Sequence, residues 1–211
     1  KNYNQSISYY PEYTVAYFKL ARTYFKIKDF DNAKEILVKN LSVDPNQEQS
    51  EKMLGDIFLR YGEIDSALIH YNKAIKINPN YSKAYYSLGT SLFKINDHIS
   101  SINALNKAID LDANYAKAYN AIGTVYQAQN ELELAINNFN SCIELNNKSY
   151  DSYYRLSSVY NQLEKFDLAK NASKKCLNIK RNYAPAYFEL GVSEKALGNK
   201  IAALSAFEKA K

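Results

Sequence analysis

A unit of 34 residues repeats along this chain of 211 residues without insertion or deletion. When the first unit is started at Thr14, each later unit starts 34 residues after the one before it. A fixed period of about 20–50 residues is typical of arrays in which each unit stacks only on its neighbours. We expect residues 1–13 to end a truncated preceding unit and residues 14–211 to form one domain. Its six units are 14–47, 48–81, 82–115, 116–149, 150–183 and 184–211, the last one incomplete.

Each unit has the pattern of a helical hairpin. The clearest example is 114–147, where apolar or small residues recur at helical spacing in two stretches separated by a polar, proline-free segment. These residues are Tyr119, Ile122, Gly123 and Tyr126, then Ala135, Phe139, Cys142 and Ile143. The scarcity of glycine (6) and proline (4) also disfavours a turn-rich β fold. The sequence therefore predicts an all-α chain of antiparallel helix pairs.

Small residues recur at two places in the unit, with Thr14 taken as position 1. Position 8 holds Ala21, Gly55, Gly89, Gly123, Ser157 and Gly191, and position 20 holds Ala33, Ala67, Ser101, Ala135, Ala169 and Ala203. We expect the two helices of a hairpin to cross there, because a larger side chain would push them apart. Position 32 holds Pro11, Pro45 and Pro79, which should end the second helix before the next unit begins.

The pattern resembles the tetratricopeptide repeat (TPR) family. The stretch GTVYQAQNELELAINNFNSC at 123–142 shows the family's order of Gly, Tyr, Ala, an aromatic residue and a small residue, and its relatives recur in the other units. The resemblance implies an α-α superhelix, a solenoid of stacked antiparallel helix pairs whose first helices line a concave groove. It also implies a protein–protein interaction scaffold.

The two ends of the array interrupt the pattern. The residues before Thr14 fit the end of a second helix, and the chain stops at Lys211 inside another, so we expect a piece of a longer protein. Unit six carries Glu194 at the aromatic position 11 and Lys200 at position 17. We expect both charges to lie near solvent; the alternative is that the regular array ends there.

Composition excludes some classes of function. No run of about 18 apolar residues is present, so no membrane span is predicted. The net charge of +5 permits an acidic protein or nucleic acid as partner and requires neither. The two cysteines, Cys142 and Cys176, are too few for a disulfide framework and are expected to be small core residues. They favour a reducing compartment, and we expect a cytoplasmic location.

No residue pattern points to catalysis. His70 and His98 lie on different second helices, each without a second His or Cys at i+3 or i+4, so we expect packing or surface roles and no metal site. Phosphate-binding glycine loops and nucleophile motifs are missing from the sequence. We therefore predict no enzyme activity and no cofactor for these residues.

A basic face of the first helices is the remaining candidate site. Positions 2, 5, 6, 9, 12 and 13 lie opposite the packing positions by the helical step of about 100°. In units one to four these positions carry eight Lys and Arg residues against Asp56 alone, with aromatic residues interleaved. The predicted peptide-binding residues are Lys19, Arg22, Lys26, Lys52, Arg60, Lys83, Tyr86, Thr90, Phe93, Lys94, Lys117, Asn120, Tyr154 and Arg155. They suit an extended acidic peptide.

Several partners stay open at this point. RNA also suits aromatic residues over a basic groove, but the family resemblance favours peptide. The carboxylate clamp of chaperone-binding TPR domains is rejected, because Lys52 and Lys117 match its positions while Asp56, Ser87 and Ala121 do not. Two other functions remain: an assembly subunit that self-associates or docks through its uncapped ends and convex face, and a substrate-recruiting array of a larger enzyme.

Overall fold

The computed structural model describes residues 3–211, which form two compact units, and each is described by itself. Unit 1 is Lys1–Asp112 and unit 2 is Ala113–Lys211. The described part of unit 1 contains α1 (Tyr3–Tyr9), α2 (Thr14–Lys26), α3 (Phe30–Val43), α4 (Glu48–Tyr61), α5 (Ile64–Ile77), α6 (Ser82–Lys94) and α7 (His98–Leu111). Unit 2 contains α8 (Ala116–Ala128), α9 (Leu132–Leu145), α10 (Tyr150–Gln162), α11 (Phe166–Ile179), α12 (Ala184–Ala196) and α13 (Lys200–Lys209).

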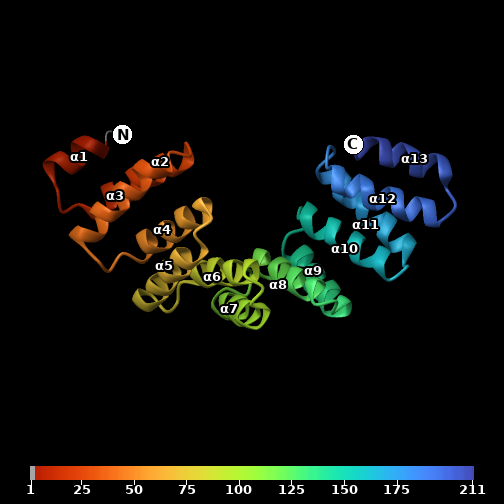
Figure 1. Cartoon of the computed structure of the whole chain (residues 1–211), viewed down its shortest axis with the longest axis horizontal. Coiled ribbons are helices and arrows are strands. Elements are labelled where there is room, and N and C mark those ends of the chain that lie inside the picture. The colour runs from red at the N-terminus through yellow and green to blue at the C-terminus, as the bar shows by residue number, and fades with distance from the viewer. Residues whose placement is uncertain (1–2) are drawn as a thin grey trace. The chain divides into compact units, whose positions relative to one another are not determined.

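Within each unit the helices stack as antiparallel hairpins (Figure 1). The strongest packing joins the two helices of one hairpin, such as α4 with α5 or α8 with α9, and weaker packing joins neighbouring hairpins. No strand occurs within residues 3–211. The expected all-α class of stacked helix pairs is confirmed. Across the same residues, each helix is too short or too polar to cross a membrane.

The turn inside each hairpin places one residue in the left-handed region. The residues there are Lys28 (φ 64), Gly62 (φ 81), Asn96 (φ 62), Asn130 (φ 62), Glu164 (φ 56) and Gly198 (φ 80). In the second hairpin, the backbone N–H of Glu63 donates to the oxygen of Phe58 at 3.0 Å, which caps the end of α4. This turn conformation strains lysine and glutamate and suits glycine. The prolines at position 32 follow the ends of α1, α3 and α5, where a helix cannot continue.

The glycines at position 8 make room for the side chain at position 24 of the same hairpin. A Cβ on Gly55 would lie 2.5 Å from the ring of Tyr71, and a Cβ on Gly123 would lie 2.6 Å from Phe139. Serines at the crossing bond to the opposite backbone: the Ser101 hydroxyl donates to the carbonyl oxygen of Gly89 at 2.8 Å. The helices thus cross where small residues were predicted, and the side chain at position 24, an aromatic ring beside Gly55, Gly123 and Gly191 and Leu105 beside Gly89, is an added reason for the small size of position 8.

The first helices bury two positions, beyond those at the crossing, that the sequence reading did not assign to the core. Position 3 is buried in all six hairpins, and position 10 is buried from the second hairpin to the sixth. The residues at position 3 are Ala16, Ser50, Ala84, Ala118, Ser152 and Ala186, and those at position 10 are Ile57, Ser91, Val125, Val159 and Ser193. Small side chains at position 3 let the neighbouring helix approach closely.

The expectation that Glu194 lies near solvent is wrong. Glu194 is 5% exposed, and its carboxylate accepts hydrogen bonds from the Lys170 amine at 3.0 Å and the Asn199 amide at 2.7 Å. Lys170 comes from α11 and Asn199 from the turn before α13. At position 11 of this hairpin, a buried ion pair therefore stands where most of the other hairpins have an aromatic side chain. Lys200 is exposed, as expected.

Candidate functional site

A pocket in unit 1 brings together part of the predicted basic face. Its volume is 430 Å³, within the range of about 300–1,000 Å³ found for ligand clefts. Helices α2, α4, α5 and α6 supply the lining, which is Phe25, Lys52, Asp56, Leu59, Arg60, Tyr71, Tyr86, Ser87, Thr90 and Lys94. Five of these residues were predicted for the groove, namely Lys52, Arg60, Tyr86, Thr90 and Lys94. We call this pocket the unit 1 groove.

The carboxylate of Asp56 lies within the unit 1 groove and is bound by two neighbouring side chains. The amine of Lys52 contacts one oxygen of Asp56 at 2.7 Å, and the hydroxyl of Tyr71 donates to the other oxygen at 3.0 Å. Tyr71 is fully buried, and its burial together with the nearby Asp56 charge raises the pKa of its hydroxyl, so it stays protonated and keeps donating. Lys52 is therefore neutralised inside the protein.

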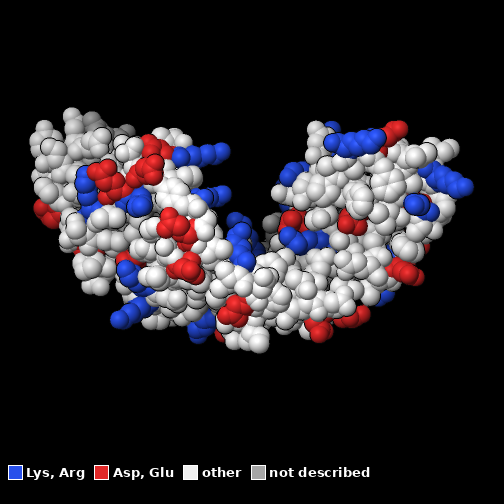
Figure 2. Space-filling view, viewed as in Figure 1, with Lys and Arg blue, Asp and Glu red and all other residues white. Residues whose placement is uncertain are grey.

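Two cations of the unit 1 groove have no partner inside the described chain. Arg60 and Lys94 are exposed and form no ion pair or side-chain hydrogen bond within residues 3–211. Figure 2 shows Lys and Arg side chains projecting at the ends of α2 and α4. The same pocket is also lined by the apolar side chains of Phe25 and Leu59 and by the weakly polar Thr90. The pocket thus combines free positive charge with apolar surface.

The other residues predicted for this face in unit 1 do not line the pocket. Lys19, Arg22 and Lys26 are exposed on α2, and Lys83 is exposed near the start of α6. The ring of Phe93 packs on the imidazole of His98, with centroids 5.6 Å apart. Sequence reasoning did not name Phe25, Leu59 or Tyr71 as site residues. Phe25 and Leu59 occupy position 12 of the predicted face, whereas Tyr71 comes from a second helix and carried no groove signal.

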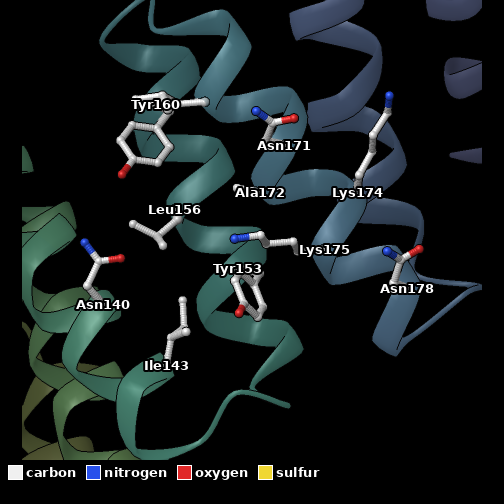
Figure 3. A pocket seen from close by; sticks show the side chains of 11 residues that line it. Asn140, Ile143, Tyr153, Leu156, Tyr160, Asn171, Ala172, Lys174, Lys175 and Asn178 are labelled. Carbon is white, nitrogen blue, oxygen red and sulfur yellow. The ribbon is translucent and has the colours of Figure 1, made fainter.

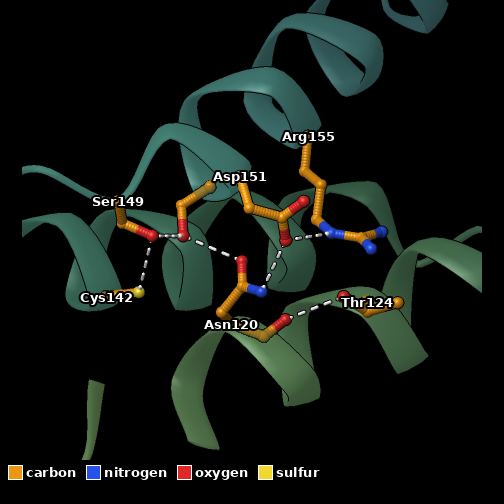
Figure 4. Close-up of polar contacts among 7 residues, drawn as sticks. Asn120, Thr124, Cys142, Ser149, Asp151 and Arg155 are labelled. Atoms are coloured by element: carbon orange, nitrogen blue, oxygen red, sulfur yellow. Dashed lines mark hydrogen bonds and ion pairs between the residues drawn. The ribbon is translucent and has the colours of Figure 1, made fainter. Parts of the chain in front are cut away.

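In unit 2, three of the four predicted residues are engaged within the fold, two of them, Asn120 and Tyr154, in contacts between neighbouring hairpins. The amide of Asn120 on α8 donates to Asp151 on α10 at 2.9 Å, and the guanidinium of Arg155 contacts the same oxygen at 3.0 Å (Figure 4). The hydroxyl of Ser152 donates to the other end of the Asn120 amide at 2.8 Å. The two bonds of Asn120 tie α8 to α10, while Arg155 is paired with Asp151 within α10.

The remaining two residues of unit 2 differ in environment. Tyr154 is half-buried and packs edge-on against Tyr183, with ring centroids 5.5 Å apart, and burial raises the pKa of its hydroxyl. Lys117 is exposed and has no ion pair in the described chain. The predicted basic face therefore keeps only one free cation among its unit 2 members.

The histidines and cysteines have packing roles. The imidazole of His70 stacks on Phe58 with centroids 5.0 Å apart, and its Nδ1 lies 2.6 Å from the carboxylate of Glu51. Cys142 and Cys176 are free and buried, which confirms that they are small core residues. Within the part of the chain that the structure describes, no three His, Cys, Asp or Glu side chains converge as metal ligands would.

Family models of one kind match most of the chain. The model described as "Tetratricopeptide repeat" matches residues 15–47, 82–115, 116–149 and 150–183, and the model described as "TPR repeat" matches residues 55–96. No curated protein sequence matches the chain closely enough to count as a relative.

Solved structures of the same architecture resemble the chain. The crystal structure of MamA is 30% identical, with 74% of this chain and 92% of MamA covered and a TM-score of 0.67. Pseudomonas aeruginosa PilF is 18% identical over 92% of this chain and 88% of PilF, with a TM-score of 0.84. YrrB, described as a TPR protein with an unusual peptide-binding site, is 19% identical over 88% of this chain and 96% of YrrB, with a TM-score of 0.67. The last two likenesses concern the fold alone.

Proposed function

Since the chain belongs to the tetratricopeptide repeat family, we propose that it is a protein-binding scaffold whose unit 1 groove holds an extended acidic segment of a partner. The observation that carries this proposal is the pairing of two free cations, Arg60 and Lys94, with the apolar wall of Phe25 and Leu59. A scaffold of this class offers partners a preformed surface, so little ordering is needed on binding.

Each part of the groove has a distinct task in the proposed complex. The planar guanidinium of Arg60 can bind a carboxylate through two parallel hydrogen bonds, and the Lys94 amine can pair with a second carboxylate. An apolar side chain of the same segment would pack on Phe25 and Leu59. Because Asp56 is held as an acceptor by Lys52 and Tyr71, the peptide should present a backbone N–H there rather than a carboxylate.

Likeness in fold adds support. YrrB, which shares this architecture, is described as having a peptide-binding site. The acidic character of the partner rests on the free cations of the unit 1 groove.

The proposal is tested by reversing the two free charges. We expect the full chain with Arg60→Glu and Lys94→Glu to bind fluorescein-labelled ten-residue peptides, in which Asp and Glu flank a Leu, at least tenfold more weakly than the wild-type chain in fluorescence polarisation. Tenfold corresponds to about 1.4 kcal/mol, which two lost rim contacts and two new repulsions can supply. Reversal of Lys52 is a poorer test, because it also breaks the pair with Asp56.

The matched control reverses two exposed lysines on α5, Lys73 and Lys76, which lie outside the groove lining. This control makes the same change in net charge and should leave the affinity within about twofold, because exposed distant charges are screened by salt. Equal losses of peptide affinity in both variants would mean that the peptide responds to the net charge of the chain and not to the groove. Unchanged binding by the groove variant would refute the proposal.

A second candidate function is assembly through the apolar surface of α13. Ile201 is 87% exposed and Leu204 is 65% exposed, so this helix presents aliphatic side chains to solvent. We expect the chain to associate as its concentration rises. A strictly monomeric mass by light scattering at high concentration would count against this function.

A further inference from the structure

A second pocket lies in unit 2, on the side of helices α9 and α11 (Figure 3). Its floor is the stripe of Tyr153, Leu156 and Tyr160 on α10, and its volume is 470 Å³. The lining is Asn140, Ile143, Tyr153, Leu156, Tyr160, Leu168, Asn171, Ala172, Lys174, Lys175 and Asn178. Tyr154 and Arg155 point away from this stripe by the helical step, so the pocket is distinct from the basic face considered above. We call it the asparagine–lysine pocket.

Apart from the Lys175 amine, which lies 5.7 Å from the centroid of the Tyr153 ring, the polar groups that line this pocket make no contact that the fold depends on. The side chains of Asn140, Asn171 and Asn178 and the amines of Lys174 and Lys175 form no hydrogen bond or ion pair within residues 3–211. The lining contains no Asp or Glu. This differs from the unit 1 groove, where Lys52 is neutralised by Asp56. Polar side chains without hydrogen-bond partners around an apolar floor are the arrangement of a binding cleft.

The pocket follows from the sequence of α11. Asn171, Lys174, Lys175 and Asn178 are spaced i, i+3, i+4 and i+7, so they share one face of the helix. The small side chain of Ala172 leaves space above Leu156 and Tyr160. Asn140, on α9, faces the α11 residues across the floor (Figure 3).

We propose that the asparagine–lysine pocket binds an extended acidic segment of a partner protein with one apolar side chain inserted against the floor. A side-chain amide carries both a donor and an acceptor, as a peptide bond does, so Asn140 and Asn171 can pair with the backbone of such a segment. Lys174 and Lys175 bind its carboxylates. The volume accepts one large side chain and its flanking backbone. This site needs no ligand in the unit 1 groove and extends the proposed function.

The floor favours peptide over nucleic acid. Base stacking needs free aromatic faces, but the amine of Lys175 already lies 5.7 Å from the centroid of the Tyr153 ring, which leaves Tyr160 alone for stacking among the lining residues. Much of the remaining lining is aliphatic, with Ile143, Leu156 and Leu168. Two lysines also neutralise few phosphates, so the salt-dependent part of polyanion binding would be small.

The experiment uses the full chain with Arg60→Glu and Lys94→Glu, so that the unit 1 groove is disabled. The probes are fluorescein-labelled ten-residue peptides in which Asp and Glu flank a single Leu, Ile or Phe. We expect saturable binding to this chain at the weaker affinity, at least tenfold below that of the wild type, that the asparagine–lysine pocket supplies alone. We expect a further loss of at least tenfold when Lys174→Glu and Lys175→Glu are added, and of about threefold when Asn171→Ala is added instead. Thermal unfolding by circular dichroism checks that each variant folds.

The matched control adds Lys148→Glu and Lys165→Glu, two exposed lysines of unit 2 that do not line the pocket. It should bind as the parent chain does. Three results would overturn the proposal: equal losses in the pocket variant and this control, no peptide binding once the unit 1 groove is disabled, or capture of labelled oligouridine in place of peptide through Lys174 and Lys175. Loss of all binding in the groove variant, with binding by the wild type, would leave the proposed function standing and this site refuted.

Discussion

Replacing Gly123 by alanine tests whether the glycines are fixed by the ring at position 24. The new Cβ would lie 2.6 Å from Cε1 and 2.7 Å from Cδ1 of Phe139, whereas ordinary contact begins at 3.4 Å. Phe139 is fully buried against Leu132, Leu156 and Val159, so its ring has no open space into which to retreat. The ring or the whole of α9 must therefore shift by about 0.8 Å.

The magnitude is the difference between two opposing terms. Overpacking of a filled core costs about 1–3 kcal/mol, whereas alanine is favoured over glycine within a helix by about 0.5–1 kcal/mol. We expect Gly123→Ala to lower the free energy of unfolding by about 1–2 kcal/mol, or the melting temperature by about 2–8 °C for a chain of this length. Thermal and urea unfolding followed by circular dichroism measure the change.

A double-mutant cycle with Phe139→Leu isolates the contact. The chain already contains an alanine–leucine pair at the same two positions, because Ala21 and Leu37 are both fully buried in the first hairpin. Gly123→Ala with Phe139→Leu should therefore cost less than the sum of the two single changes, with a coupling of about 1 kcal/mol. If Gly123→Ala stabilised the chain, or if the two changes were additive, helix propensity alone would decide and our reasoning would be refuted.

Three further changes test other parts of the structure. Glu164→Gly should stabilise the chain by about 0.5–1 kcal/mol in urea unfolding, because Glu164 has a φ of 56°, whereas Gly62→Ala at a φ of 81° should destabilise it; a loss on Glu164→Gly would contradict this. Burial alone raises the pKa of Glu194, but its hydrogen bonds outweigh burial and lower that pKa. The stability lost on Glu194→Gln should therefore be present at neutral pH and shrink as pH falls below 4.5, the ordinary value; a difference independent of pH would argue against the ion pair. Burial raises the pKa of Cys176 to about 11, so in a Cys142→Ala chain a thiol reagent at pH 8 should react only as fast as the protein unfolds, and rapid labelling would disprove this.

The helices were predictable because the same 34-residue pattern marks their positions in six successive units. The predicted first position of each unit coincides with the start of a first helix, for example Ala116 for α8 and Tyr150 for α10. The apolar spacing, the polar turns and the prolines all agree on the same boundaries, which is the consistency expected of a sequence that specifies one fold. A single unit would have left its ends uncertain by a few residues.

The contacts between hairpins were harder to predict, because they depend on which face meets a neighbour. Small residues recur at position 3 as regularly as at position 8, so that signal was available in the sequence. The ion pair of Lys170 with Glu194 had no such signal, since the two residues are 24 apart and meet only after two helices have packed. The same holds for Tyr71, which reaches the unit 1 groove from a second helix.

The free cations, rather than all cations, decide where an acidic ligand can bind, and part of this distinction can be read from sequence. Lys52 and Arg155 each have an aspartate four residues away on the same helix, and each is paired with it in the structure. Arg60 also lies four residues from Asp56 but stays without an ion pair, because Lys52 and Tyr71 already engage that carboxylate. Lys174 and Lys175 have no Asp or Glu three or four residues away in either direction, and neither forms an ion pair within residues 3–211. Counting every Lys and Arg on the first helices included Lys52, which is paired with Asp56, and left out Lys174 and Lys175, which lie on the second helix α11. Counting only the cations that have no Asp or Glu three or four residues away on the same helix points to the asparagine–lysine pocket. That pocket is therefore the sharper test of acidic recognition by this chain.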